Sequence, residues 1–111
     1  MARTEWPARP WFHRVGPARN ARTCDRYLEV TYRKGKPVAA YLYLPRDLGA
    51  TATRTEDAGN GLRIDYDATG KALGIELTAP GLATAEHVNA VMLRLGHDPL
   101  QSREWAPLEA A

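Results

Sequence analysis

The chain has 111 residues, of which 44% are hydrophobic and 25% charged, and its formal net charge is +2. This length and composition are typical of one globular domain without low-complexity segments. No apolar run reaches the roughly 18 residues of a membrane-spanning helix, and the first residues lack the pattern of a secretory signal. We therefore expect a cytoplasmic protein without a membrane partner, and its single cysteine, Cys24, agrees with a reducing compartment.

Residues 1–24 form an N-terminal arm that carries the basic character of the chain. Residues 1–26 contain six arginines and two acidic residues, so the rest of the chain is net acidic. Prolines at positions 7, 10 and 17 predict an irregular arm, because proline interrupts helices and central strands. Its aromatic residues are unusual in a solvated tail, so we expect the arm to lie partly on the domain or on a partner.

Residues 27–44 predict a first β-hairpin. Apolar residues alternate with other residues along 27–32 and again along 38–44, as expected for two strands that each bury one face. The segment 34–37 forms the turn between them. Pro45 ends the second strand, because proline cannot donate to the sheet ladder.

The segment between this hairpin and the next gives a weaker signal. Thr51, Thr53 and Thr55 alternate in a β-favouring stretch that is compatible with a short edge strand. Residues 57–61 are rich in turn-forming types and predict a flexible connection into the next strand.

Residues 62–77 give the strongest structural signal, a second β-hairpin. Residues 62–66 and 72–77 each alternate between apolar and polar positions. The connection runs from Asp67 to Gly70; aspartate can bond its own backbone and glycine supplies a positive φ.

A single amphipathic helix is predicted over residues 85–95. Its apolar residues recur at spacings of three and four, Thr84 is placed to cap its N-terminus, and Gly96 is placed to end it. Two later prolines predict that residues 98–111 form an irregular tail, with Trp105 and Leu108 as anchors.

These elements predict one α+β domain over residues 25–97. We expect two consecutive antiparallel hairpins that form a meander of four or five strands, the fifth being an edge strand. One C-terminal helix packs on one face of this sheet.

Short β motifs occur at Leu42-Tyr43-Leu44, Ile64-Asp65-Tyr66-Asp67, Gly70 and Gly74-Ile75-Glu76-Leu77. With these motifs, part of the chain resembles domain-of-unknown-function family 2283, which comprises small bacterial β-rich proteins. The resemblance covers residues 27–77; where the family usually has an acidic residue before its Leu-Tyr-Ile strand, this chain has Ala39-Ala40. It implies a β-rich fold and no defined activity, and some members are encoded beside small toxin-like proteins, which implies partner binding.

Three carboxylates near the second hairpin are candidates for chemistry. Asp65, Asp67 and Glu76 could supply oxygen ligands to a hard cation or act as an acid–base pair. We favour structural roles, because Arg63 shares their face and an aspartate at a turn already accepts hydrogen bonds from the backbone. No catalytic residue and no cofactor are predicted, since the sequence lacks the common nucleotide-binding and hydrolase motifs.

The arm and the tyrosines are candidates for binding. Aromatic residues and arginines are enriched at protein interfaces, which points to Trp6, Trp11, Phe12, Tyr41 and Tyr43. Arginines interleaved with aromatics also suit single-stranded nucleic acids. The nucleic-acid candidates are Arg9, Arg14, Arg19 and Arg22. A third interpretation is that the arm only covers the open side of the sheet.

Our leading hypothesis is a non-catalytic bacterial binding protein that engages a protein partner or itself. The alternatives are a nucleic-acid-binding or antitoxin-like regulator that uses the basic arm, and a metal-binding or enzymatic role at the hairpin carboxylates.

Overall fold

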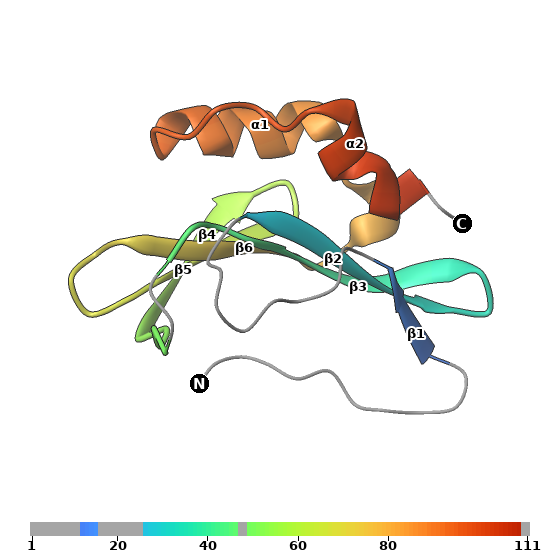
Figure 1. Cartoon of the computed structure of the whole chain (residues 1–111), viewed down its shortest axis with the longest axis horizontal. Helices are drawn as coiled ribbons and strands as arrows, with labels where there is room; N and C mark the ends of the chain where they lie inside the picture. Colours follow the sequence, from blue (N-terminus) through green and yellow to red (C-terminus); the bar gives the residue numbers. More distant parts are fainter. Residues whose placement is uncertain (1–11, 16–25, 47–48, 110–111) are drawn as a thin grey trace.

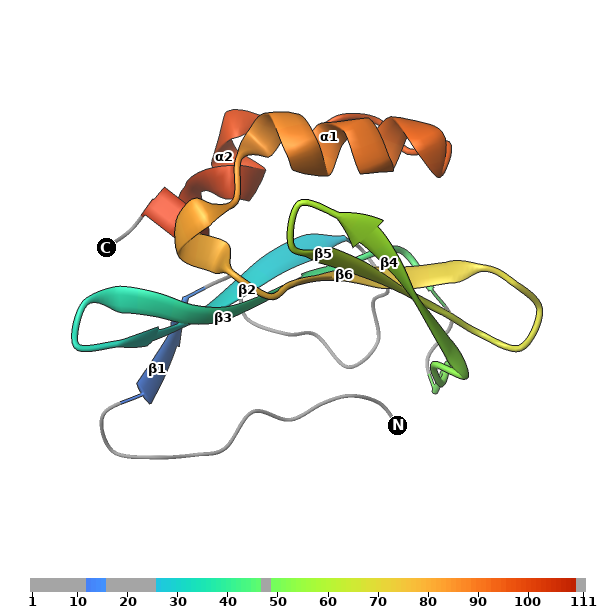
Figure 2. The same cartoon turned by 180° about the vertical axis from the view of Figure 1, so that it is seen from behind.

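The computed structural model describes residues 12–15, 26–46 and 49–109 as an antiparallel sheet with short helices on one of its faces (Figures 1 and 2). The predicted α+β class is thereby confirmed. The strands are β1 (Phe12–Val15), β2 (Tyr27–Arg33), β3 (Lys36–Tyr43), β4 (Arg54–Gly59), β5 (Leu62–Tyr66) and β6 (Ala72–Leu77). The helical elements are η1 (Pro80–Leu82), α1 (Ala85–Arg94), α2 (Ser102–Trp105) and η2 (Ala106–Glu109).

The strand order is β1-β2-β3-β6-β5-β4, so the predicted meander is wrong at its centre. β3 pairs with β6 rather than with the next hairpin strand, and this register places Leu42 opposite Ile75. The reason is that both edges of β5 are already occupied, one by β4 and the other by β6. β3 therefore pairs with an outer strand of this second unit, and that strand is β6.

The edge strand predicted around residues 51–55 exists, but it begins and ends later. β4 runs from Arg54 to Gly59, where we expected a flexible connection. Asn60 and Gly61 form the turn into β5 with φ angles of +55° and +75°. Asparagine followed by glycine favours a two-residue hairpin turn of this kind, which explains the longer strand.

The N-terminal arm also contributes to the sheet. Phe12–Val15 forms β1, which pairs with β2 where we expected irregular chain. The other residues of the arm lie outside the described part of the chain.

The second hairpin follows the prediction. The Asp67 carboxylate accepts hydrogen bonds from the Thr69 amide and hydroxyl at 2.8 and 2.7 Å and from the Lys71 amide at 3.0 Å. The Thr69 hydroxyl, followed by the Lys71 amide, lowers the pKa of Asp67 below its usual value. Gly70 has a φ of +90°, as the turn requires.

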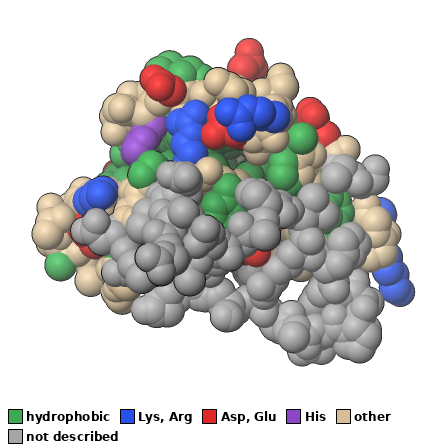
Figure 3. Space-filling view, viewed as in Figure 1, with side chains coloured by type: hydrophobic (Ala, Val, Ile, Leu, Met, Phe, Trp, Pro, Cys, Tyr) green, Lys and Arg blue, Asp and Glu red, His purple; other side chains and the backbone are tan. Residues whose placement is uncertain are grey.

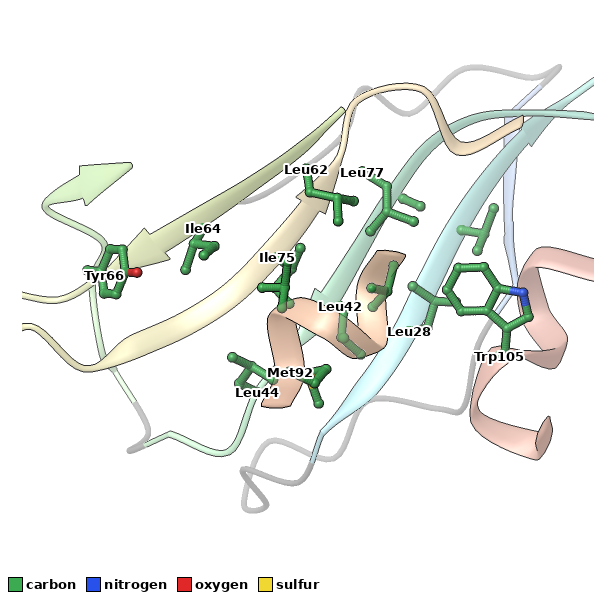
Figure 4. Packing of buried hydrophobic residues seen from close by; sticks show 14 of the residues in the cluster. Leu28, Leu42, Leu44, Leu62, Ile64, Tyr66, Ile75, Leu77, Met92 and Trp105 are labelled. Atoms are coloured by element: carbon green, nitrogen blue, oxygen red, sulfur yellow. The ribbon is translucent and has the colours of Figure 1, made fainter. Parts of the chain in front are cut away.

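The core lies between the sheet and α1 with α2 (Figure 4). A helix forms where we predicted one, and the Thr84 hydroxyl accepts a hydrogen bond from the His87 amide at 3.2 Å to cap it. It is not the single C-terminal helix that we expected, because α2 and η2 follow it. Figure 4 shows Met92 of α1 beside Leu44 and Trp105 of α2 beside Leu28. The fully buried aliphatic residues of the sheet include Leu28, Val30, Leu42, Leu44, Leu62, Ile64, Ile75 and Leu77.

The C-terminal tail is more regular than predicted, because residues 102–109 form α2 and η2. Trp105 is only 8% exposed and Leu108 packs partly against the core, so both predicted anchors are confirmed. Arg26 donates to both carboxylate oxygens of Glu104, at 2.8 and 3.0 Å, and ties α2 to the beginning of β2. Within the described ranges, no helix has the length and apolarity needed to cross a bilayer.

Candidate functional site

Three tyrosines, Tyr27, Tyr41 and Tyr43, line the sheet face opposite the helices. The β2–β3 register places Tyr27 beside Tyr43, and their rings stack with centroids 4.6 Å apart. Tyr41 meets Tyr43 edge to face at 4.7 Å, and the Arg46 guanidinium lies 5.1 Å from the Tyr43 ring centroid. Tyr41 and Tyr43 are only 2% and 5% exposed, so these two predicted interface residues do not form an open binding surface.

Gly74 allows Tyr41 to reach across β6 to β5. A β-carbon at position 74 would overlap the Tyr41 ring, so only glycine leaves room for it. The Tyr41 hydroxyl donates to Asp65 at 2.9 Å, and the Thr55 hydroxyl donates to the other Asp65 oxygen at 2.7 Å. Asp65 is 6% exposed, so these two donors stabilise a buried carboxylate.

The structure does not gather the three candidate carboxylates into a metal site. Asp65 is engaged by two hydroxyls, Asp67 caps the β5–β6 turn, and Glu76 lies opposite Arg63 in the β5–β6 register. Among the residues that the structure describes, no three His, Cys, Asp or Glu side chains are grouped closely enough to hold a metal ion. The arrangement instead fits the structural roles favoured from the sequence.

A basic surface lies at the β2–β3 hairpin tip, which we define as Arg33, Lys34, Gly35 and Lys36. The chain has no acidic residue from position 30 to position 46, and Lys34 and Lys36 are exposed. Figure 3 shows Lys and Arg side chains at the end of the molecule where Figure 1 places this hairpin. The tip is therefore a projecting positive surface.

The turn in this hairpin has an unfavourable residue at its first position. Lys34 and Gly35 have φ angles of +52° and +79°, as in a type I′ turn. A non-glycine residue in the left-handed region costs roughly 1 kcal/mol, and asparagine tolerates this region better than lysine does. The β4–β5 turn of the same chain has the favourable residue, Asn60, at the corresponding position.

An apolar patch, which we define as Val38 and Leu82, lies near the base of the hairpin. Leu77, the last residue of β6, lies opposite Ala40 of β3, so the chain that follows β6 continues toward the first residues of β3. η1 lies against β3 there. Pro80 is buried and fixes η1, whereas Leu82 is 84% exposed and Val38 is 44% exposed. Leu82 is thus presented to solvent from an anchored turn.

Most candidates in the N-terminal arm cannot be placed at a site. Phe12 and Arg14 belong to β1, of which the structure describes the backbone pairing. The other arm candidates, Trp6, Trp11, Arg9, Arg19 and Arg22, lie outside the described residues.

The sequence-based candidates did not include the hairpin tip or the apolar patch. Two signals were available: a stretch of 17 residues without an acidic side chain, and a lysine before glycine where a two-residue turn favours asparagine. The exposure of Leu82 could not be predicted, because it depends on how η1 leaves the sheet.

Comparisons with known proteins add no relative. No protein-family model, no curated protein and no solved structure matches the chain. The resemblance described above therefore stays a prediction.

Proposed function

We propose that this is a non-catalytic cytoplasmic binding protein that engages a protein partner through the apolar patch. The observation that supports the proposal is the 84% exposure of Leu82 on an element whose first residue is buried. Partner binding is also what the family resemblance implies.

Leu82 is held in place before a partner binds, because Pro80 anchors η1. An exposed apolar side chain gains free energy when a partner covers it, at about 25 cal/mol per Å² of apolar surface. A side chain on an anchored element loses little conformational freedom on binding, so more of this gain remains as affinity. Val38 on the neighbouring strand enlarges the surface that a partner would cover.

Leu93 provides a matched comparison. It is 61% exposed on α1 and is another large apolar residue at the described surface. Single exposed leucines are common on protein surfaces and need no function. Leu82 differs because Val38 lies on the element beside it.

The test is a selection of random twelve-residue peptides on the immobilised full chain, followed by titration of the enriched peptides. We expect Leu82→Ser to weaken their binding by about tenfold or more, as for an interface anchor, and Leu93→Ser to change it by less than about twofold. Both side chains are exposed, so both variants should fold, which circular dichroism checks. Failure to enrich any peptide, or equal effects of the two variants, would contradict the proposal.

Self-association is examined separately by light scattering over a range of protein concentrations. If the partner is a second copy of the chain, the mass rises with concentration and Leu82→Ser abolishes the rise. If the mass equals that of the monomer at every concentration, the partner is a different protein.

A further inference from the structure

We propose that the partner segment is acidic and that the β2–β3 hairpin tip recognises it, an inference that rests on the proposed function. The tip supplies the charge and the apolar patch supplies an anchor for one apolar side chain of the same segment. The ligand class is therefore a peptide that combines carboxylates with an apolar residue.

The two lysines of the tip have no acidic residue near them along the chain. Lys34 and Lys36 are exposed on either side of Gly35, and the nearest acidic residues along the chain are Glu29 and Asp47. Like charges held close together repel one another and attract carboxylates, which complementary interfaces use for selectivity.

The backbone of Lys34 is strained, which also points to a function of the hairpin tip. The turn holds lysine in the left-handed region at φ +52°, although the chain uses asparagine at the same position of its β4–β5 turn. Backbone strain that a simple substitution would relieve is a pointer to function. Here the strained position is occupied by an exposed lysine of the hairpin tip.

The position of the apolar patch favours a peptide over a phosphate polymer. Lys36 and Val38 are both exposed and two residues apart at the beginning of β3, where its pairing with β2 is irregular, so one extended segment can contact both. Leu82 lies on η1 against the same strand. Binding to a nucleic-acid backbone would use the lysines and gain nothing from these two apolar side chains.

The experiment uses the same peptide selection and four chains: the natural protein, Lys34→Asn, the double variant Lys34→Asn with Lys36→Gln, and Lys71→Gln. Lys71 is an exposed lysine at the β5–β6 turn, whose backbone amide and not its side chain bonds to Asp67, so its variant is the matched control. Thermal unfolding is measured on each chain beside peptide affinity.

We expect enriched peptides to contain several Asp or Glu residues and at least one large apolar residue. Lys34→Asn should raise the unfolding midpoint by roughly 3 °C, because the turn becomes less strained, while weakening peptide binding by roughly fivefold. The double variant should weaken binding by roughly twentyfold and Lys71→Gln by less than about twofold. Raising NaCl from about 0.1 to 0.5 M should weaken binding to the natural protein.

Four results would overturn the inference. Enriched peptides whose binding depends on Leu82 but that are not rich in Asp or Glu would contradict the inference about the hairpin tip and leave the proposed function intact. A double variant that binds peptides as tightly as the natural protein would have the same consequence. Enrichment of no peptide would remove both. Tighter binding of a twenty-nucleotide single-stranded DNA or of phosphatidylserine vesicles, dependent on Lys34 and Lys36 but not on Leu82, would assign the tip to a phosphate-bearing ligand.

Discussion

Gly74 is the residue on which the tyrosine side of the sheet depends. The Tyr41 ring occupies the space that a side chain at position 74 would take. Tyr41 of β3 can therefore reach across β6 and donate a hydrogen bond to Asp65 of β5. Covering a strand glycine with an aromatic ring is a recognised way to stabilise a sheet.

Gly74→Ala is expected to destabilise the protein by about 2 to 4 kcal/mol, because the new methyl group displaces Tyr41 and leaves Asp65 with one donor fewer. Urea unfolding measures the change. Gly81→Ala is the control: its β-carbon would meet no atom within 4 Å, so its effect should stay below about 0.5 kcal/mol. Equal stability of the two variants would show that the Tyr41 ring moves without cost.

Tyr41→Phe tests the hydrogen bond apart from the packing. The ring remains, but the buried Asp65 loses its 2.9 Å donor, so we expect a loss of about 1 to 3 kcal/mol in the free energy of unfolding. The control is Tyr43→Phe, since the Tyr43 hydroxyl lies 3.4 Å from Glu29 and makes a weaker bond. If both variants lose the same stability, the Asp65 network has no special role.

At the scale of elements, Arg26 fastens the C-terminal segment to the sheet. Besides its two bonds to Glu104, it donates to the carbonyl oxygens of Asp98 and Pro99 at 2.7 and 3.1 Å. The hydrogen bond from Arg26 lowers the pKa of Glu104, and the bond to Glu104 raises the pKa of Arg26. We call this set of contacts the Arg26 clamp.

The Arg26 clamp predicts an acid-sensitive contribution to stability. A carboxyl whose pKa is lowered on folding contributes its full stabilisation above its unfolded pKa, and the contribution is lost as the pH falls through the folded value. Glu104→Gln should therefore cost about 1 to 2 kcal/mol at pH 7 and less at an acidic pH, because the stabilisation is lost as the pH falls through the lowered pKa of Glu104. Urea unfolding at both pH values measures this difference, and a cost independent of pH would exclude an ionic clamp.

Elements whose signals are local were predictable from the sequence. The Asp67–Gly70 turn and the Thr84-capped helix follow from residues within a few positions of one another, and both are present. The Asn60-Gly61 turn was equally local, but a turn-rich segment was interpreted as flexible, so β4 was placed too early. Strand β1 had no local signal, because its pairing with β2 is a tertiary contact.

The candidate site was less predictable than the fold. Residue types identified Tyr41, Tyr43 and the carboxylates, but their burial and partners depend on the neighbouring strands. Leu82 and Val38 are ordinary apolar residues in sequence, and only the course of the chain after β6 exposes them beside a basic turn.

At the scale of the whole molecule, the sheet consists of two three-stranded units joined where β3 meets β6. Within each unit the strands follow one another in the chain, whereas the joint pairs strands that are far apart in sequence. The same joint directs the chain after β6 toward the hairpin, so it also positions η1.

Ile75→Ala is expected to weaken both units together. Ile75 is fully buried on β6 and lies opposite Leu42 of β3 and Ile64 of β5, so the cavity should cost about 2 to 5 kcal/mol. Hydrogen exchange should show amides of β2 and β5 losing protection to the same extent. Loss confined to β4, β5 and β6 would mean that the two units unfold independently.

The proposed binding surface is tested most directly by amide chemical-shift mapping of the full chain during titration with a selected acidic peptide. We predict shifts concentrated at residues 33–38 and 81–83, which belong to separate parts of the sequence and meet only in this fold. Salt should diminish the shifts, and Lys34→Asn should reduce them at equal peptide concentration. Shifts centred on the β4–β5 hairpin or on α1 around Leu93, or no shifts at all, would contradict binding at the hairpin tip and the apolar patch.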